Sequence, residues 1–270
     1  MDYAHARHAG NAGDVFKHVA LVALLEEAGR DPAALTYVET HAGDGLFPLG
    51  SAGEWGAGVQ LLWNATDGLV GRYARLVRSF SGPGATRPGT YPGSPLIAAK
   101  LLGPKDRLLL YELEPQAASV LKRALSGDAR AEVRESDGVG VLQKTVRGVG
   151  KTLVLVDPPY TQKQEWTESA QAVGRALQAA PAAAIALWYP IKALTRPRGL
   201  LAELAKLSVH GLAIELHWTP LRLKRERLNG SGLVLINVPR GAQREICGAL
   251  TDLGPLLQTH GEWSGSEIGF

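Results

Sequence analysis

The sequence predicts an α/β fold built on a doubly wound sheet of seven strands, one of them reversed. Short apolar runs alternate with segments of helical periodicity along most of the 270 residues, as in parallel strands joined by crossover helices. The run 152–156 has no polar alternation, so we expect it to be buried on both faces at the sheet centre. The last two runs, 212–218 and 232–238, have no helix between them and should pair antiparallel.

Composition narrows the class of protein. The chain is 45% hydrophobic, and its 29 Lys and Arg against 26 Asp and Glu give a net charge of +3, which only weakly favours an anionic partner. The single cysteine, Cys247, excludes an internal disulfide and argues against a thiolate metal site. No apolar run is long enough to span a bilayer and there is no signal-peptide layout. We therefore expect a cytoplasmic monomer with one domain over residues 1–270.

The first helix should follow a polar N-terminal segment. Asn11 or Asp14 can cap it, and Gly29 is a stop signal. Lys17 and His18 then lie in its first turns, beside free backbone N–H groups that suit a carboxylate. Four of the seven histidines precede residue 42, but no carboxylate or cysteine has metal-ligand spacing with them, so no metal site is expected.

Acidic residues follow successive predicted strands. The strand 35–39 ends in Glu39 before a glycine-bearing turn, and the strand 107–112 ends in Glu112, placed to accept both hydroxyls of a ribose. Asp137 follows a short strand and is placed to hold an adenine amine. Each acid alone is compatible with an ordinary turn. Four in succession, ending with Asp157, indicate a nucleotide-like ligand at the carboxyl edge of the sheet.

More than sixty residues separate the first two strands, which is too many for an ordinary crossover. Residues 46–93 are therefore expected to form an inserted helical subdomain. Ser94 then opens a helix at 96–102, either as its cap, which is the commoner use of such a serine, or as a ligand contact.

The motif Asp157-Pro158-Pro159-Tyr160 ends the central strand and is typical of enzymes that methylate an exocyclic amino group, above all N6 of adenine. The Asp157 carboxylate and the Pro158 carbonyl can accept the two amine hydrogens, and proline fixes the direction of that carbonyl. Tyr160 offers a flat face for an extruded base. The alternative is an ordinary Asp-Pro turn.

The chain resembles the bacterial 23S rRNA (adenine-N6)-methyltransferase family that modifies adenine 2030. Matching segments occur in one order over nearly the whole chain: Tyr3 with His5, His8–Asn11, Asp14-Val15, Lys17-His18, Thr40–Gly43, Tyr91–Pro95, Glu112-Leu113, Asp137-Gly138, Asp157–Tyr160, Leu187–Pro190, Ser231-Gly232 and Ile236-Asn237. Two departures are Glu114, where the family often has histidine, and Gly13, which is expected to loosen the start of the first helix.

The resemblance implies a class I, Rossmann-like methyltransferase that uses S-adenosylmethionine and no metal. It implies 23S rRNA as partner, naked or in an early assembly intermediate, with Asp157 at the target amine. Tyr3, together with His5, would contact the RNA. The expected cofactor pocket is lined by Lys17, His18, His41, Ser94, Glu112, Asp137 and Gly138.

The hairpin 220–230 carries four basic residues and one acid. We expect the basic residues of this hairpin to contact RNA phosphates: Arg222, Lys224, Arg225 and Arg227; the alternative is a solvated turn. Two other functions remain open from the sequence: methylation of DNA adenine, since the Asp157 motif is shared, and an RNA-binding module with an inactive site.

Overall fold

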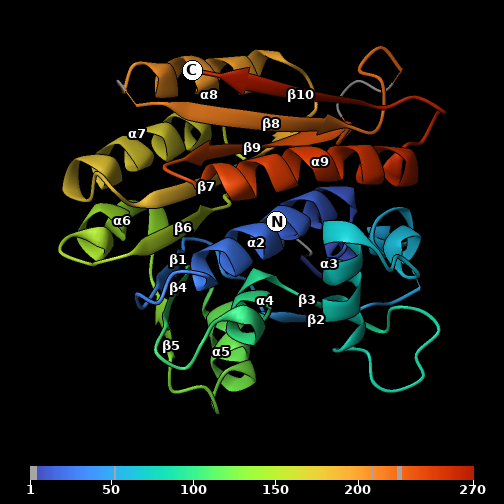
Figure 1. Cartoon of the computed structure of the whole chain (residues 1–270), viewed down its shortest axis with the longest axis horizontal. Helices are drawn as coiled ribbons and strands as arrows, with labels where there is room; N and C mark the ends of the chain where they lie inside the picture. Colours follow the sequence, from blue (N-terminus) through green and yellow to red (C-terminus); the bar gives the residue numbers. More distant parts are fainter. Residues whose placement is uncertain (1–4, 52, 208, 224–226) are drawn as a thin grey trace.

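The computed structural model describes residues 5–51, 53–207, 209–223 and 227–270, with side chains described from Arg7 onward. Within these residues, eight strands form one sheet in the order β10-β8-β9-β7-β6-β1-β4-β5 (Figure 1). These strands are β1 (Thr36–Glu39), β4 (Arg107–Glu112), β5 (Ala131–Glu135), β6 (Thr152–Val156), β7 (Ala184–Ile191), β8 (Gly211–His217), β9 (Gly230–Ile236) and β10 (Ser264–Gly269). Two short strands, β2 (Leu46–Pro48) and β3 (Thr90–Pro92), pair separately.

The predicted α/β class is confirmed. Strand β1 pairs in parallel with β4 and β6, and β6 pairs in parallel with β7. All five residues of β6 are buried, as its unbroken apolar run predicts. Strand β9 is antiparallel to both β7 and β8 and is the expected reversed strand. The structure adds β10, which lies antiparallel against β8 at the sheet edge and is a second reversed strand.

Two layers of helices cover the sheet (Figure 1). One layer contains α2, α4, α5 and α9, and the other contains α6, α7 and α8. Among the described residues, no helix is both long and apolar enough to cross a bilayer. The helices are α1 (His5–His8), α2 (Ala12–Gly29), α3 (Gly68–Arg78), α4 (Ser94–Leu101), α5 (Pro115–Ala124), α6 (Gly138–Val146), α7 (Gln164–Ala179), α8 (Thr195–Ala205) and α9 (Arg240–Leu257).

The segment 46–93 lies beside α2 and contains β2, two 3₁₀ turns (Glu54–Ala57 and Val59–Leu62), α3 and β3. Its buried side chains, such as Leu62 and Tyr73, belong to the same apolar cluster as α2. Arg72 of α3 also bridges two helices, because its guanidinium pairs with Glu26 of α2, at 2.9 Å, and with Glu245 of α9. The inserted segment therefore shares the core of the main domain.

This topology gathers acidic residues at one edge of the sheet, because parallel strands end at the same edge. Strands β1, β4 and β6 end at Glu39, Glu112 and Val156, and Asp157 follows Val156 directly. Asp137 follows β5 and caps α6. The four acids that the sequence places after successive strands are thus brought to the carboxyl edge.

Candidate active site at the carboxyl edge of the sheet

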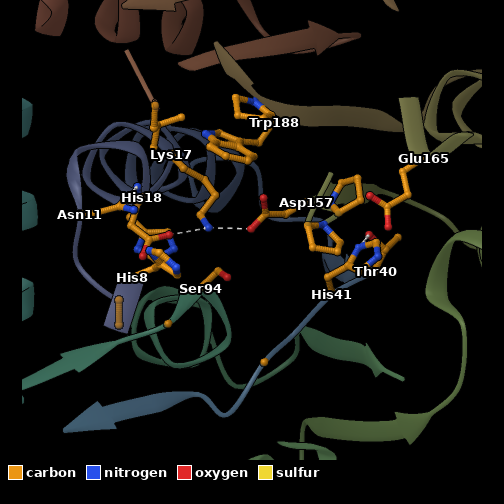
Figure 2. Close-up of a pocket in the computed structure, with 18 of the residues that line it drawn as sticks. His8, Asn11, Lys17, His18, Thr40, His41, Ser94, Asp157, Glu165 and Trp188 are labelled. Atoms are coloured by element: carbon orange, nitrogen blue, oxygen red, sulfur yellow. Dashed lines mark hydrogen bonds and ion pairs between the residues drawn. The ribbon is translucent and has the colours of Figure 1, made fainter. Parts of the chain in front are cut away.

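A cleft of about 1270 Å³ opens at this edge, between the first turns of α2 and the segments that follow β1, β4, β5, β6 and β7 (Figure 2). It brings together all seven residues expected to bind the cofactor and two of the three expected to act on the substrate. Those nine residues are Lys17, His18, His41, Ser94, Glu112, Asp137, Gly138, Asp157 and Pro158.

Lys17 is held in the cleft by the start of α2. Asn11 is the N-cap and accepts from the Asp14 backbone N–H at 3.0 Å. Lys17 Nζ then lies 2.8 Å from Asp14 Oδ1 and 2.6 Å from Asp157 Oδ2 (Figure 2). Burial alone lowers the pKa of Lys17, but the two carboxylates outweigh it and raise the pKa well above its ordinary value. Lys17 is therefore a fixed cation on the predicted catalytic acid.

The Asp157 carboxylate has one engaged oxygen and one open oxygen. Lys17 donates to Oδ2, whereas no described residue donates a hydrogen bond to Oδ1. The prolines Pro158 and Pro159 follow it and line the cleft. Oδ1 is therefore an acceptor with a fixed direction, and the turn that follows it is made rigid by two prolines.

Tyr160 departs from the expected arrangement. Its side chain is buried, its hydroxyl donates to the Trp188 carbonyl at 2.9 Å, and its ring packs 4.3 Å from that of Trp166. The residue adopts φ 52°, in the left-handed region that disfavours a bulky side chain. This turn directs the ring into the core, so its face is covered by Trp166 and is not open to a base.

Trp188 of β7 is the aromatic residue that lines the cleft beside Asp157 (Figure 2). Lys17 Nζ lies 5.7 Å from the centroid of its ring. Gly13 packs against the same ring, since a Cβ there would come within 3.3 Å of both Trp188 and Leu228. Gly13 thus lies within α2 and allows a close contact; it does not loosen the helix start.

His18 presents an unpaired nitrogen to the cleft. Its Nδ1 lies 2.7 Å from the hydroxyl of Tyr91, which in turn is 3.0 Å from the hydroxyl of Tyr73. Nε2 is buried and has no hydrogen-bond partner among the described residues. Burial, with the nearby Lys17 charge, lowers the pKa of His18 to about 3, so the ring is neutral near pH 7.

Ser94 is not the cap of α4. Gly93 occupies that position without a side-chain hydrogen bond, and the Ser94 hydroxyl donates to the carboxyl of Glu39. Tyr37 donates to the other Glu39 oxygen at 2.9 Å. Burial raises the pKa of Glu39 to about 8 despite these hydrogen bonds. The end of β1 is therefore a buried polar cluster behind the cleft.

The loops after β4 and β5 form the opposite end of the cleft. Glu112 is buried and accepts from the backbone N–H groups of Gly43, at 2.7 Å, and Glu114, at 2.9 Å. Asp137 caps α6 by accepting from Val139 and Gly140. A Cβ on Gly138 would come within 2.4 Å of the Thr40 carbonyl, so only glycine permits this approach.

His41 follows β1 and lines the cleft between these two ends. Its Nδ1 lies 2.8 Å from the Thr40 hydroxyl. Burial lowers its pKa below the ordinary value, which favours the neutral ring. Within the described part of the chain, no group of three or more His, Cys, Asp and Glu side chains is placed to hold a metal ion.

Of the residues expected to contact RNA, Arg222 and Arg227 have described side chains, and Arg227 lines the cleft. Tyr3, Lys224 and Arg225 lie outside the described residues, and His5 begins α1 with its side chain outside the description. Arg222 is exposed and pairs with Glu262 through two contacts of 2.7 and 2.8 Å. It lines a second hollow beside α8 and not the cleft. Contact between Arg222 and RNA phosphates stays a prediction.

Sequence reasoning missed several contacts made by residues in or behind the cleft. Asp14 and Trp188 contact Lys17, and Glu39 holds Ser94. The signal for Asp14 and Lys17 was their helical i, i+3 spacing. No sequence signal joins Lys17 to Asp157, which is 140 residues away.

Comparison with known proteins gives concordant matches. Residues 32–266 match the model of the family described as ribosomal RNA large subunit methyltransferase D, RlmJ. Two curated relatives named ribosomal RNA large subunit methyltransferase J, from Escherichia coli K12 and Haemophilus influenzae Rd, are each 32% identical over 248 residues, with 88% of both chains covered. A crystal structure of protein LPL1258 from Legionella pneumophila has a TM-score of 0.90 at 29% identity and covers 97% of this chain and 98% of that one.

Proposed function

The chain belongs to the RlmJ family of ribosomal RNA large subunit methyltransferases, and we propose that it methylates N6 of adenine 2030 in 23S rRNA. The observation that carries the reaction type is the open Asp157 Oδ1 at the mouth of the cleft, with the other oxygen held by Lys17. The sequence alternatives, a DNA adenine methyltransferase and an inactive RNA-binding module, are less well supported. The relatives are named rRNA methyltransferases, and the acids of the cleft are all in place.

The residues of the cleft fit S-adenosylmethionine. Glu112 offers a buried carboxylate for the ribose hydroxyls, and Asp137 lies at the N-terminus of α6, placed for the adenine amine. The unpaired His18 Nε2 is a ready partner for the methionine end of the cofactor. When bound, this cofactor supplies an electrophilic methyl group.

Asp157 aligns the target amine. An exocyclic adenine amine is a poor nucleophile because its lone pair is delocalised into the ring. Asp157 Oδ1 accepts one amine hydrogen and the Pro158 carbonyl accepts the other, which turns the lone pair toward the methyl donor. The Lys17 contact prevents the carboxylate from rotating, so rate enhancement comes mainly from alignment.

The proton of the amine leaves after methyl transfer, because the N–H of neutral adenine N6 is too weakly acidic to be deprotonated first. Asp157 Oδ1 and water are the acceptors available at the mouth of the cleft. The substrate is 23S rRNA, either naked or in an early assembly intermediate.

Mapping of methylated nucleotides tests the proposal. Unmodified 23S rRNA transcript, incubated with enzyme and S-adenosylmethionine, should gain N6-methyladenosine at position 2030 by mass spectrometry of nuclease fragments. A transcript with guanine at that position should gain none. Methylation of another adenine would refute the target, and methylation of duplex DNA in place of rRNA would refute the substrate class.

A further inference from the structure

The two walls of the cleft carry opposite charge. The first wall comprises the lining residues from Thr40 to Gly140, and its ionic side chains are all carboxylates: Glu54, Glu112, Glu114 and Asp137. The second wall comprises the lining residues from Trp188 to Thr259. Among its described residues it has two cations, Lys192 and Arg227, and no carboxylate. Asp157 lies between the walls, because β6 separates β1, β4 and β5 from β7 and β9.

The separation of negative and positive charge between the two walls affects how a polyanion such as RNA can bind. The first wall repels phosphate and the second wall attracts it, so of the two walls the second is the favourable side for the backbone of an RNA substrate. Lys192 follows the end of β7, and Arg227 precedes the start of the antiparallel β9. Both residues therefore lie at the carboxyl edge, on the same side of Asp157.

Backbone hydrogen bonds hold the second wall together. The Asn229 backbone N–H donates to the Ile191 carbonyl at 2.9 Å, and the Asn229 carbonyl accepts from Trp218 and Thr219 at 3.0 Å each. Arg227 is two residues before Asn229, which places its backbone within about 7 Å of that anchor. The base of the hairpin is thus anchored beside the end of β7, which Lys192 follows.

The side chains of Lys192 and Arg227 are both exposed. Neither forms an ion pair with another described residue. Arg222, in the same hairpin, is neutralised by two contacts with Glu262. Arg7 and Arg175 also line the cleft, but they lie outside the second wall.

We infer that Lys192 and Arg227 form a phosphate clamp that holds the RNA backbone next to the target adenine. The inference rests on the proposed function and adds the residues that hold its substrate. The clamp binds phosphate by charge and does not read bases. Arg227 is one of the hairpin cations that the sequence predicts to contact phosphate, and Lys192 is the addition.

Binding to unmodified 23S rRNA transcript across a salt series tests the clamp. Each phosphate contact with single-stranded nucleic acid contributes about 0.7 to the slope of log K against log salt. Lys192→Ala and Arg227→Ala should each lower the slope by about 0.7 and weaken binding about fivefold at about 0.1 M salt. The double variant should lose about 1.4 in slope.

Matched variants separate the clamp from general charge effects. Arg227→Lys should retain the slope, because charge and not shape is required. Arg147→Ala removes an exposed cation between α6 and β6, at the opposite edge of the sheet, and should bind like the wild type. Cofactor affinity, measured by calorimetry, should be unchanged in every variant, which shows that the cleft is intact.

Three outcomes overturn the inference: an unchanged slope in the double variant, an equal loss in Arg147→Ala, or an equal loss in Arg222→Ala. In each case methyl transfer by the wild type still stands as evidence for the proposed function. Conversely, a wild-type enzyme that binds S-adenosylmethionine and transfers no methyl group to the transcript refutes the proposed function, whatever its salt slope.

Discussion

At the scale of one residue, the proposed role of Asp157 requires an acceptor oxygen that is held in a fixed direction. Lys17 meets this requirement, since its ammonium group donates to Oδ2 at 2.6 Å and restricts rotation of the carboxylate. Asp14 contributes by holding Lys17 from the side of its own helix. Asp14, Lys17 and Asp157 therefore form a chain of two ion pairs.

Asp157→Asn should reduce methyl transfer by about 10²–10³, the cost of one lost polar contact in a transition state. The amide keeps the shape of the side chain, but it removes the charge that pairs with Lys17. Single-turnover transfer to rRNA measures the rate, and calorimetry should show nearly unchanged cofactor affinity. Glu203→Gln, at an exposed carboxylate on α8 paired with Lys206, is the control. Near-normal turnover in Asp157→Asn would refute the role.

Glu39 makes stability depend on pH. Burial raises its pKa to about 8, so the folded chain retains a proton that the unfolded chain releases above its ordinary value of 4.5. Between these two values the free energy of unfolding falls as pH rises, by up to about 1.4 kcal/mol per pH unit.

Glu39→Gln should remove this dependence, because the amide does not titrate. The difference in unfolding free energy, variant minus wild type, should therefore increase from about pH 5 to about pH 8 and then level off. Urea unfolding at several pH values measures it. Glu203→Gln should give a difference that does not vary with pH, and a constant difference for Glu39→Gln would contradict the assignment.

At the scale of the elements, β7, β8 and β9 are joined by a side-chain contact across the sheet. Tyr189, Gly232 and Glu215 are neighbours on three adjacent strands. The Tyr189 hydroxyl donates to Glu215 at 2.8 Å, across β9. A Cβ at Gly232 would come within 2.1 Å of the tyrosine ring, so glycine leaves the space that this contact needs.

Gly232→Ala should destabilise the protein by about 1–3 kcal/mol through overpacking. Urea unfolding measures the loss, and in a Tyr189→Ala background most of it should disappear, because the obstructing ring is gone. Gly29→Ala is the matched control: no atom lies within 4 Å of its Cβ, at the end of α2, so it should be neutral or slightly stabilising. Equal stability of Gly232→Ala and wild type would refute the crowding.

At the scale of the whole molecule, the segment 46–93 and the sheet share one apolar core. Leu62 is fully buried in that core, whereas its neighbour Leu61 is 43% exposed. Ion pairs from Arg72 join the segment to α2 and α9 as well. We therefore propose that the inserted segment and the remainder unfold together.

Leu62→Ala should lower the free energy of unfolding by about 2–5 kcal/mol, in a single transition. Far-ultraviolet circular dichroism and tryptophan fluorescence should report the same midpoint in urea. Leu61→Ala should change stability by less than about 0.5 kcal/mol. Separate transitions would show that the segment 46–93 is an independent unit.

Much of the fold was predictable because buried strands carry strong apolar runs. The run 152–156 coincides with β6, and 107–112 coincides with β4. Strand β10 was missed because its residues are mostly polar and exposed, as an edge strand permits. Helix α9 was missed as well, since Gly248 and Pro255 interrupt its pattern.

The site residues that stand at the ends of strands, such as Glu112 and Asp157, were predictable. It was not predictable where contacts depend on packing between distant elements. Tyr160 was expected to face a base, but a left-handed turn directs it into the core. Ser94 donates to Glu39 and does not cap α4. This contact depends on the position of β1, which the local sequence around Ser94 does not reveal.

The ion pair between Lys17 and Asp157 has a consequence for the order in which a folding chain gains activity. Its partners are separated by 140 residues, and β1, β4, β5 and β6 must be in register before they can meet. Contacts between such distant residues are slow to form, because loop closure costs entropy before the contact repays it. During refolding, methyl transfer should therefore return after helical circular dichroism, and an rRNA would meet a competent enzyme only once the whole chain is assembled.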